Sequence, residues 1–91
     1  MVLTFPAHLT HELAAPAVLA LKSALAARAG AAVVADASAL EKFDSSALAV
    51  LLACRREVLA SGKTFSVQGL PERLRRLAGL YGVELLLPAA P

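Results

Sequence analysis

Short apolar runs alternate along this chain with longer stretches in which apolar residues recur at helical spacing. The runs Val2–Phe5, Ala32–Asp36 and Thr64–Gln68 have the length and composition of strands, and Glu84–Leu87 predicts a last, short strand. A helical stretch separates each run from the next. This βαβαβαβ order favours an α/β fold with a four-stranded, mostly parallel sheet, right-handed crossovers and three or four helices.

The first predicted helix follows Thr10, which can act as an N-cap, and ends at Gly30. Pro16 marks either the first turn of the main helix or a kink near its start. Ala32–Asp36 has no polar alternation, so we expect this strand to be buried on both faces. In the connection that follows, Leu40 and Phe43 are expected to anchor inward.

The second predicted helix begins at the triplet Asp44–Ser46 and ends at Gly62, and the third has Pro71 in its first turn and ends at Gly82. Apolar spacing predicts their inward residues. These are Leu48, Leu52 and Leu59 in the second helix, and Leu74, Leu77, Ala78 and Tyr81 in the third.

Composition limits the class of protein. The 91 residues form a single expected domain, residues 1–91, whose 58% hydrophobic content is rich in alanine and leucine. A membrane span is not expected, because the longest clean apolar run, Ala47–Cys54, is far below about 20 residues. A signal peptide is not expected, because the N-terminal residues 1–6 lack a positively charged region and a cleavage site. Cys54 is the single cysteine and is expected to be a reduced, buried core thiol. We therefore expect a cytoplasmic location.

The charged residues argue against nucleic-acid binding. The net charge is only +2, and the basic groups, Arg55-Arg56 and Arg73, Arg75 and Arg76, have acidic neighbours and no interleaved aromatic residues. These arginines are expected on solvated helix faces or at the rim of a protein interface.

Candidate chemistry gathers where the carboxyl ends of parallel strands meet. That edge receives Asp36, the loop to Phe43, and the triplet Asp44–Ser46. One cap explains a single Asp or Ser there, but two adjacent hydroxyls exceed what a cap requires. Ala47 follows, and its small side chain lets another surface approach closely. The alternatives are a cap alone or a partner-binding notch made of Asp44, Ser45, Ser46 and Ala47.

Catalysis, metal binding and cofactor binding find little support. His8 and His11 are the only histidines that could activate Ser45 or Ser46, and so short a chain has little room for a shaped pocket. Two histidines and one distant cysteine make no metal motif, and no phosphate-binding glycine loop is present. We therefore expect a non-enzymatic protein with no cofactor and no metal.

The segments Val33–Ser38 and Phe43–Leu48, followed by an apolar helix, resemble the signature of STAS domains, the domains of sulfate transporters and anti-sigma-factor antagonists. Within this family, the chain is most similar to the small STAS subunit of a bacterial phospholipid ABC transporter. This narrower resemblance rests on the segment Val67–Leu70 and on the helix that carries Leu80-Tyr81. The resemblance extends from Phe5 over nearly all of the chain. The chain departs from the STAS pattern in two ways. Ala47 replaces the commoner glycine, and the family's additional first strand is missing before Val2–Phe5. Either the sheet has four strands or the true start lies upstream.

This resemblance implies a cytoplasmic accessory subunit that binds the transporter's ATPase at the inner membrane and helps to maintain outer-membrane lipid asymmetry. Ser45 matches the hydroxyl residue that is important in the family. The alternative is an anti-sigma-factor antagonist switched by phosphorylation at the position of Ser46.

Overall fold

The computed structural model describes residues 1–27 and 30–90. Its central sheet has three parallel strands in the order β1 (Val2–Thr4), β3 (Ala32–Asp36) and β5 (Thr64–Gln68). A separate parallel pair joins β2 (His8–Leu9) to β4 (Lys42–Phe43). The bounds of β3 and β5 match the predicted runs, and the prediction of a small α/β fold with a mostly parallel sheet is confirmed.

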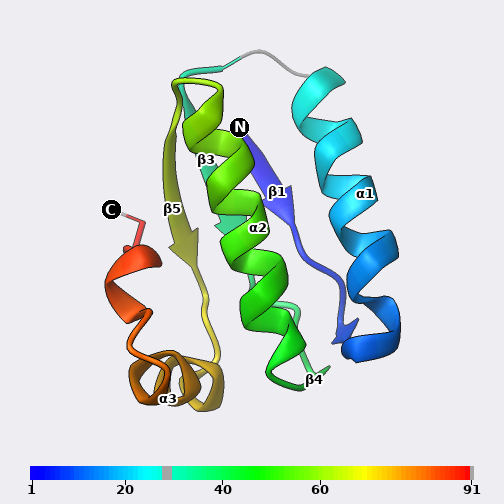
Figure 1. Ribbon diagram of the computed structural model, residues 1–91, viewed down its shortest axis with the longest axis vertical. Coiled ribbons are helices and arrows are strands. Elements are labelled where there is room, and N and C mark those ends of the chain that lie inside the picture. The colour runs from blue at the N-terminus through cyan, green and yellow to red at the C-terminus, as the bar shows by residue number, and fades with distance from the viewer. Residues whose placement is uncertain (28–29, 91) are drawn as a thin grey trace.

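Helices cover only one face of this sheet. In Figure 1, α2 (Ser46–Ala60) runs in front of β3. Helix α1 (His11–Ala27) lies to the right of α2, beyond β1. Along β3, Val33 and Ala35 are buried whereas Val34 and Asp36 are only half-buried. Burial on both faces of Ala32–Asp36 was therefore a wrong expectation, since small apolar residues also line the uncovered face.

The inward face of α2 differs from the one predicted. Leu48 is buried as expected, but Leu52 is only half-buried and Leu59 is 43% exposed. After Leu51 the buried positions continue at Cys54 and Val58, three and four residues further along, so the core-facing stripe does not pass through Leu59. The buried residues of α2 are Ala47, Leu48, Val50, Leu51, Cys54 and Val58. Leu40, in the loop after β3, is buried as predicted, whereas Phe43 is half-buried.

The C-terminal part departs most from the sequence prediction. Helix α3 (Glu72–Leu80) buries Leu74 and Ala78, but Tyr81 follows its end and is 61% exposed. Glu84–Leu86 forms a 3-10 helix, η1, where a strand was predicted. The fourth place in the sheet goes instead to Ala89, which bridges Val67 in parallel fashion. The bridge is held by hydrogen bonds from Val67 N–H to Pro88 C=O and from Ala90 N–H to Val67 C=O.

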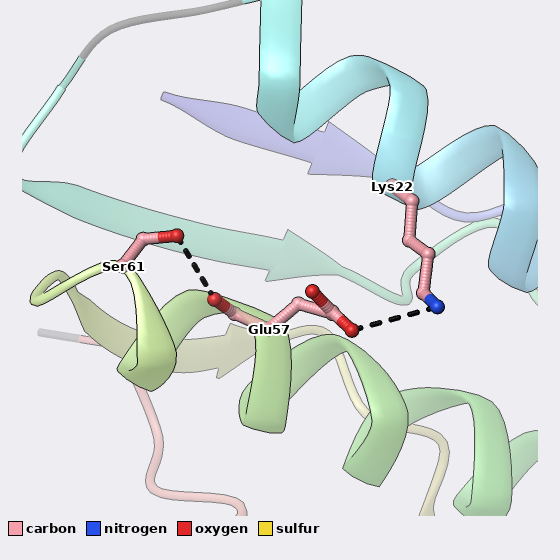
Figure 2. A network of polar contacts seen from close by, with 3 residues as sticks. All are labelled: Lys22, Glu57 and Ser61. Carbon is pink, nitrogen blue, oxygen red and sulfur yellow. Dashed lines mark hydrogen bonds and ion pairs between the residues drawn. The ribbon is translucent and has the colours of Figure 1, made fainter.

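Helix α1 is continuous through Pro16 and packs along α2. Figure 2 shows the polar tie between them, in which Lys22 of α1 lies 3.6 Å from the carboxylate of Glu57 of α2. At the C-terminal end of α2 the Ser61 hydroxyl donates to the backbone carbonyl of Glu57. Because both charged side chains are about half exposed, this ion pair contributes at most about 1 kcal/mol. The contact between α1 and α2 therefore depends mainly on apolar packing.

Within the described residues, no helix has the length and apolar content needed to cross a bilayer.

Candidate functional site

The predicted polar residues lie where the carboxyl ends of the strands meet. Asp36 ends β3 and faces Gln68, the last residue of β5, across the parallel register. The triplet Asp44–Ser46 follows β4 and opens α2. The β2–β4 pair brings this triplet next to the start of α1, so two helix N-termini converge there.

Asp44 serves both of these helices. One carboxylate oxygen accepts the N–H of Ser46 at 2.8 Å, and the other accepts the N–H of His11 at 3.0 Å. Each bond satisfies a helix amide that has no partner within its own helix. The bonds from His11 and Ser46 stabilise the ionised form and hold the pKa of Asp44 below its usual value. Asp44 is therefore the residue that joins α1 to α2 at this end.

Ser45 has no such structural task. Its backbone angles are already helical, at φ −62° and ψ −18°, and its side chain makes no cap hydrogen bond. The residue is exposed, whereas Ser46 is half-buried beside Asp44. Ala47 is completely buried and so presents no surface to a partner, which corrects its predicted role. Of the predicted notch, Asp44 and Ser45 are exposed and Ala47 supports them from the core.

A second turn on the same edge centres on Asp36. Its carboxylate accepts the hydroxyl of Ser38 at 2.6 Å and the N–H of Ser38 at 3.0 Å, and these bonds lower the pKa of Asp36. The turn after β5 packs tightly against Ser38, because a Cβ on Gly69 would lie 2.6 Å from the Cβ of Ser38. Gly69 also has φ +68°, a conformation that glycine adopts at little cost.

Arg73 lies close to the candidate site, and the sequence analysis did not predict this position. Its guanidinium carbon lies 4.6 Å from the centre of the Phe43 ring, within the range of a cation–π contact. Phe43 directly precedes Asp44, so this contact brings the start of α3 toward the triplet. The cluster of arginines was visible in the sequence, but nothing local paired Arg73 with a residue thirty positions earlier.

The other candidate groups do not assemble into a reactive site. Among the described residues, neither histidine side chain hydrogen-bonds to Ser45 or Ser46, and no cluster of metal-binding side chains forms. Cys54 is buried in the core as predicted, and burial raises the pKa of its thiol to about 11. A thiol with so high a pKa stays protonated at neutral pH and is a poor nucleophile.

Comparison with known proteins identifies the family. No curated protein sequence matches this chain. The family model described as "Mlab, STAS domain" matches residues 6–88, which include the strand ends, the triplet and all three helices. Since the match covers most of the sequence, the chain belongs to the STAS domain family, in its MlaB-like branch.

Proposed function

We propose that this protein is a non-enzymatic accessory subunit that binds and supports the ABC ATPase of an Mla-type phospholipid transport system. In this proposal it lies in the cytoplasm, reaches the inner membrane only through the ATPase, and helps to maintain outer-membrane lipid asymmetry. The family match supports the type of domain. One observation supports the use of its surface for a partner: Ser45 is exposed and its side chain caps no helix.

The geometry around Ser45 suits a protein interface better than a reaction. Asp44 already caps both helices, so the Ser45 hydroxyl is available to a backbone or side-chain group of the ATPase. The residue stands on a rigid support, because α2 packs its buried face directly into the core. A partner that loses this hydrogen bond at a closed interface leaves a polar group unpaired, which costs about 1–3 kcal/mol.

The alternative function, an anti-sigma-factor antagonist, requires phosphorylation of Ser46. That residue is half-buried, and its N–H is held by the Asp44 carboxylate. A phosphoryl group would add a charge of about −1.5 to −2 beside this carboxylate. The repulsion disfavours the modified state, so we prefer the ATPase-binding function.

The test is co-purification of this chain with the ABC ATPase, followed by a binding titration of variants. Ser45→Ala is expected to weaken binding about tenfold to a hundredfold, and Ser45→Leu more strongly, because it adds bulk at the interface. Ser23→Leu is the matched control, since Ser23 is an exposed serine on α1 away from the triplet. A thermal melt of each variant checks that the fold is intact.

Equal binding of the parent and Ser45→Leu would place the interface elsewhere. Incorporation of phosphate at Ser46 by a serine-kinase anti-sigma factor, together with no affinity for the ATPase, would favour the antagonist function instead.

A further inference from the structure

The side chain of Arg73 is held beside the candidate site by an aromatic ring. Its guanidinium carbon lies 4.6 Å from the centre of the Phe43 ring, and Phe43 is fixed in β4 by its pairing with the completely buried Leu9. Figure 1 shows α3 at the end of the molecule where β4 lies and α2 begins. An arginine that is already stacked on a fixed ring loses less side-chain freedom when a partner binds.

The positive charge of Arg73 is not neutralised by a neighbouring acid. Arg73 is exposed, and no carboxylate of the described residues forms an ion pair with it. Asp44 directly follows Phe43, but its two carboxylate oxygens accept the N–H groups of His11 and Ser46. Because Asp44 is committed to the two helix starts, the Arg73 guanidinium keeps its N–H donors for another group.

The two other arginines of α3 differ from Arg73. Arg76 is paired within the helix, since its guanidinium lies 3.1 Å from the Glu72 carboxylate. Arg75 lies about 200° around the helix from Arg73, where it lines a pocket together with Glu84. Nucleic acids and anionic membranes are bound by several cations together, whereas one guanidinium matches one carboxylate through two parallel hydrogen bonds. A single unpaired arginine beside the triplet therefore fits a carboxylate of a protein.

We infer that Arg73 is a second contact point of the partner-binding surface around Ser45 and that it binds a carboxylate of the partner. This role of Arg73 rests on the function proposed for Ser45, and it names the chemistry of the partner's surface: an Asp or Glu of the ATPase, close to the group that bonds to Ser45. Phe43 is a positioning residue, because it acts through the arginine. The hydroxyl and the guanidinium bind different groups, so together they fix the orientation of the partner.

The test measures binding of the ABC ATPase to variants of this chain over a range of salt concentrations. Arg73→Gln is expected to weaken binding about tenfold at low salt and much less at about 0.5 M salt, because salt screens the ion pair. Ser45→Ala is expected to weaken binding at every salt concentration, since it removes no charge. Arg75→Gln, on the other side of α3, is the matched control and is expected to bind as the parent does. Thermal melts check the fold of each variant.

Two further variants separate the charge of Arg73 from its position. Phe43→Leu is expected to lower the affinity while it leaves the salt dependence of the parent, because the charge remains and only the ring that holds it is lost. Arg73→Glu is expected to abolish binding. Among ATPase variants in which single surface Asp or Glu residues are replaced by Lys, one is expected to bind Arg73→Glu more tightly than it binds the parent.

The outcomes separate this role of Arg73 from the proposed function. Loss of binding in Ser45→Leu with parental binding in Arg73→Gln and Arg73→Glu would overturn the role of Arg73 and leave the proposed function standing. No binding of the parent chain to the ATPase would overturn both. Equal losses in Arg73→Gln and Arg75→Gln would also overturn the role, as would binding of the parent to phosphatidylglycerol vesicles that Arg73→Gln abolishes, because Arg73 would then serve a membrane.

Discussion

At the level of single residues, helix capping separates Asp44 from Ser45. Sequence reasoning treated both as candidates for a cap, because Asp and Ser occupy that position with similar preference. In the fold the Asp44 carboxylate accepts both helix amides, from His11 and Ser46, and the Ser45 hydroxyl accepts none. Substitution at Asp44 should therefore affect stability, and substitution at Ser45 should affect partner binding.

Asp44→Ala is expected to lower the melting midpoint clearly, because it removes the cap of α1 and the cap of α2 together. Ser45→Ala is expected to leave the midpoint almost unchanged, since no cap bond is lost. Circular dichroism melts of the two variants and the parent provide the comparison. A larger loss of stability at Ser45 than at Asp44 would contradict the assignment of the cap.

Stability is also expected to fall in acid. Asp36 and Asp44 have pKa values below the usual 3.8, because hydrogen bonds from Ser38 and from His11 and Ser46 favour their ionised forms. A carboxyl group with a lowered pKa in the folded state stabilises the fold above its unfolded pKa, and this contribution is lost as the pH falls through the lowered value. Denaturant titrations between about pH 7 and pH 2 measure this loss. The acid-dependent part should be smaller in Asp44→Asn, which carries no titratable group there.

At the level of elements, the buried stripe of α2 passes through Leu51 and not through Leu59. Leu51 is fully buried, whereas Leu59 is 43% exposed. Leu51→Ala is expected to cost about 2–5 kcal/mol of unfolding free energy through lost transfer energy and the cavity left behind. Leu59→Ala is expected to cost less than about 1 kcal/mol. Urea titrations of this pair test the stripe, and equal losses would show that the helix is rotated.

Two glycines with similar backbone angles provide a second matched pair. Gly69 has φ +68° and lies against Ser38, while Gly62 has φ +74° with open space around its Cα. Alanine at either position is strained by about 1–2 kcal/mol. Only Gly69→Ala also forces apart the two turns on the candidate edge, so it is expected to be the more destabilising variant. If both variants unfold at the same denaturant concentration, the turns are not in close contact.

At the level of the whole molecule, the sheet is covered on one face only. The protein therefore has a well-buried part and a marginal part, which buries little apolar surface. Strand β3 is central and α2 contributes six buried residues, whereas α1 contributes none within its bounds. Regions with little buried apolar surface open locally at lower free energy than the core. Helix α1 belongs to this marginal part.

Native-state hydrogen exchange should therefore be faster in α1 than in α2 and β3. We expect the central amides of α1 to exchange through local opening, and those of Val33 and Ala35 to require global unfolding. Equal protection of α1 and α2 would show that the two helices unfold as one unit.

The sequence alone determined most of the elements and the family. Strands β3 and β5 begin and end at the predicted residues, and Gly62 and Gly82 follow α2 and α3, because apolar period and turn residues act within a few positions of the chain. The STAS-like sequence pattern around Asp44–Ser46 also lies within a short segment of the chain, and the family match agrees with it.

Only the tertiary structure decided which surfaces these elements share. It placed the two helix starts on one carboxylate, Arg73 over Phe43, and Gly69 against Ser38. It also left one sheet face uncovered, turned Leu59 to solvent, and gave the fourth place in the sheet to Ala89. Each of these features joins residues that are distant in sequence or depends on which side a helix covers. These contacts and exposures depend on how the helices and strands pack against one another, and the local pattern of polar and apolar residues does not predict that packing.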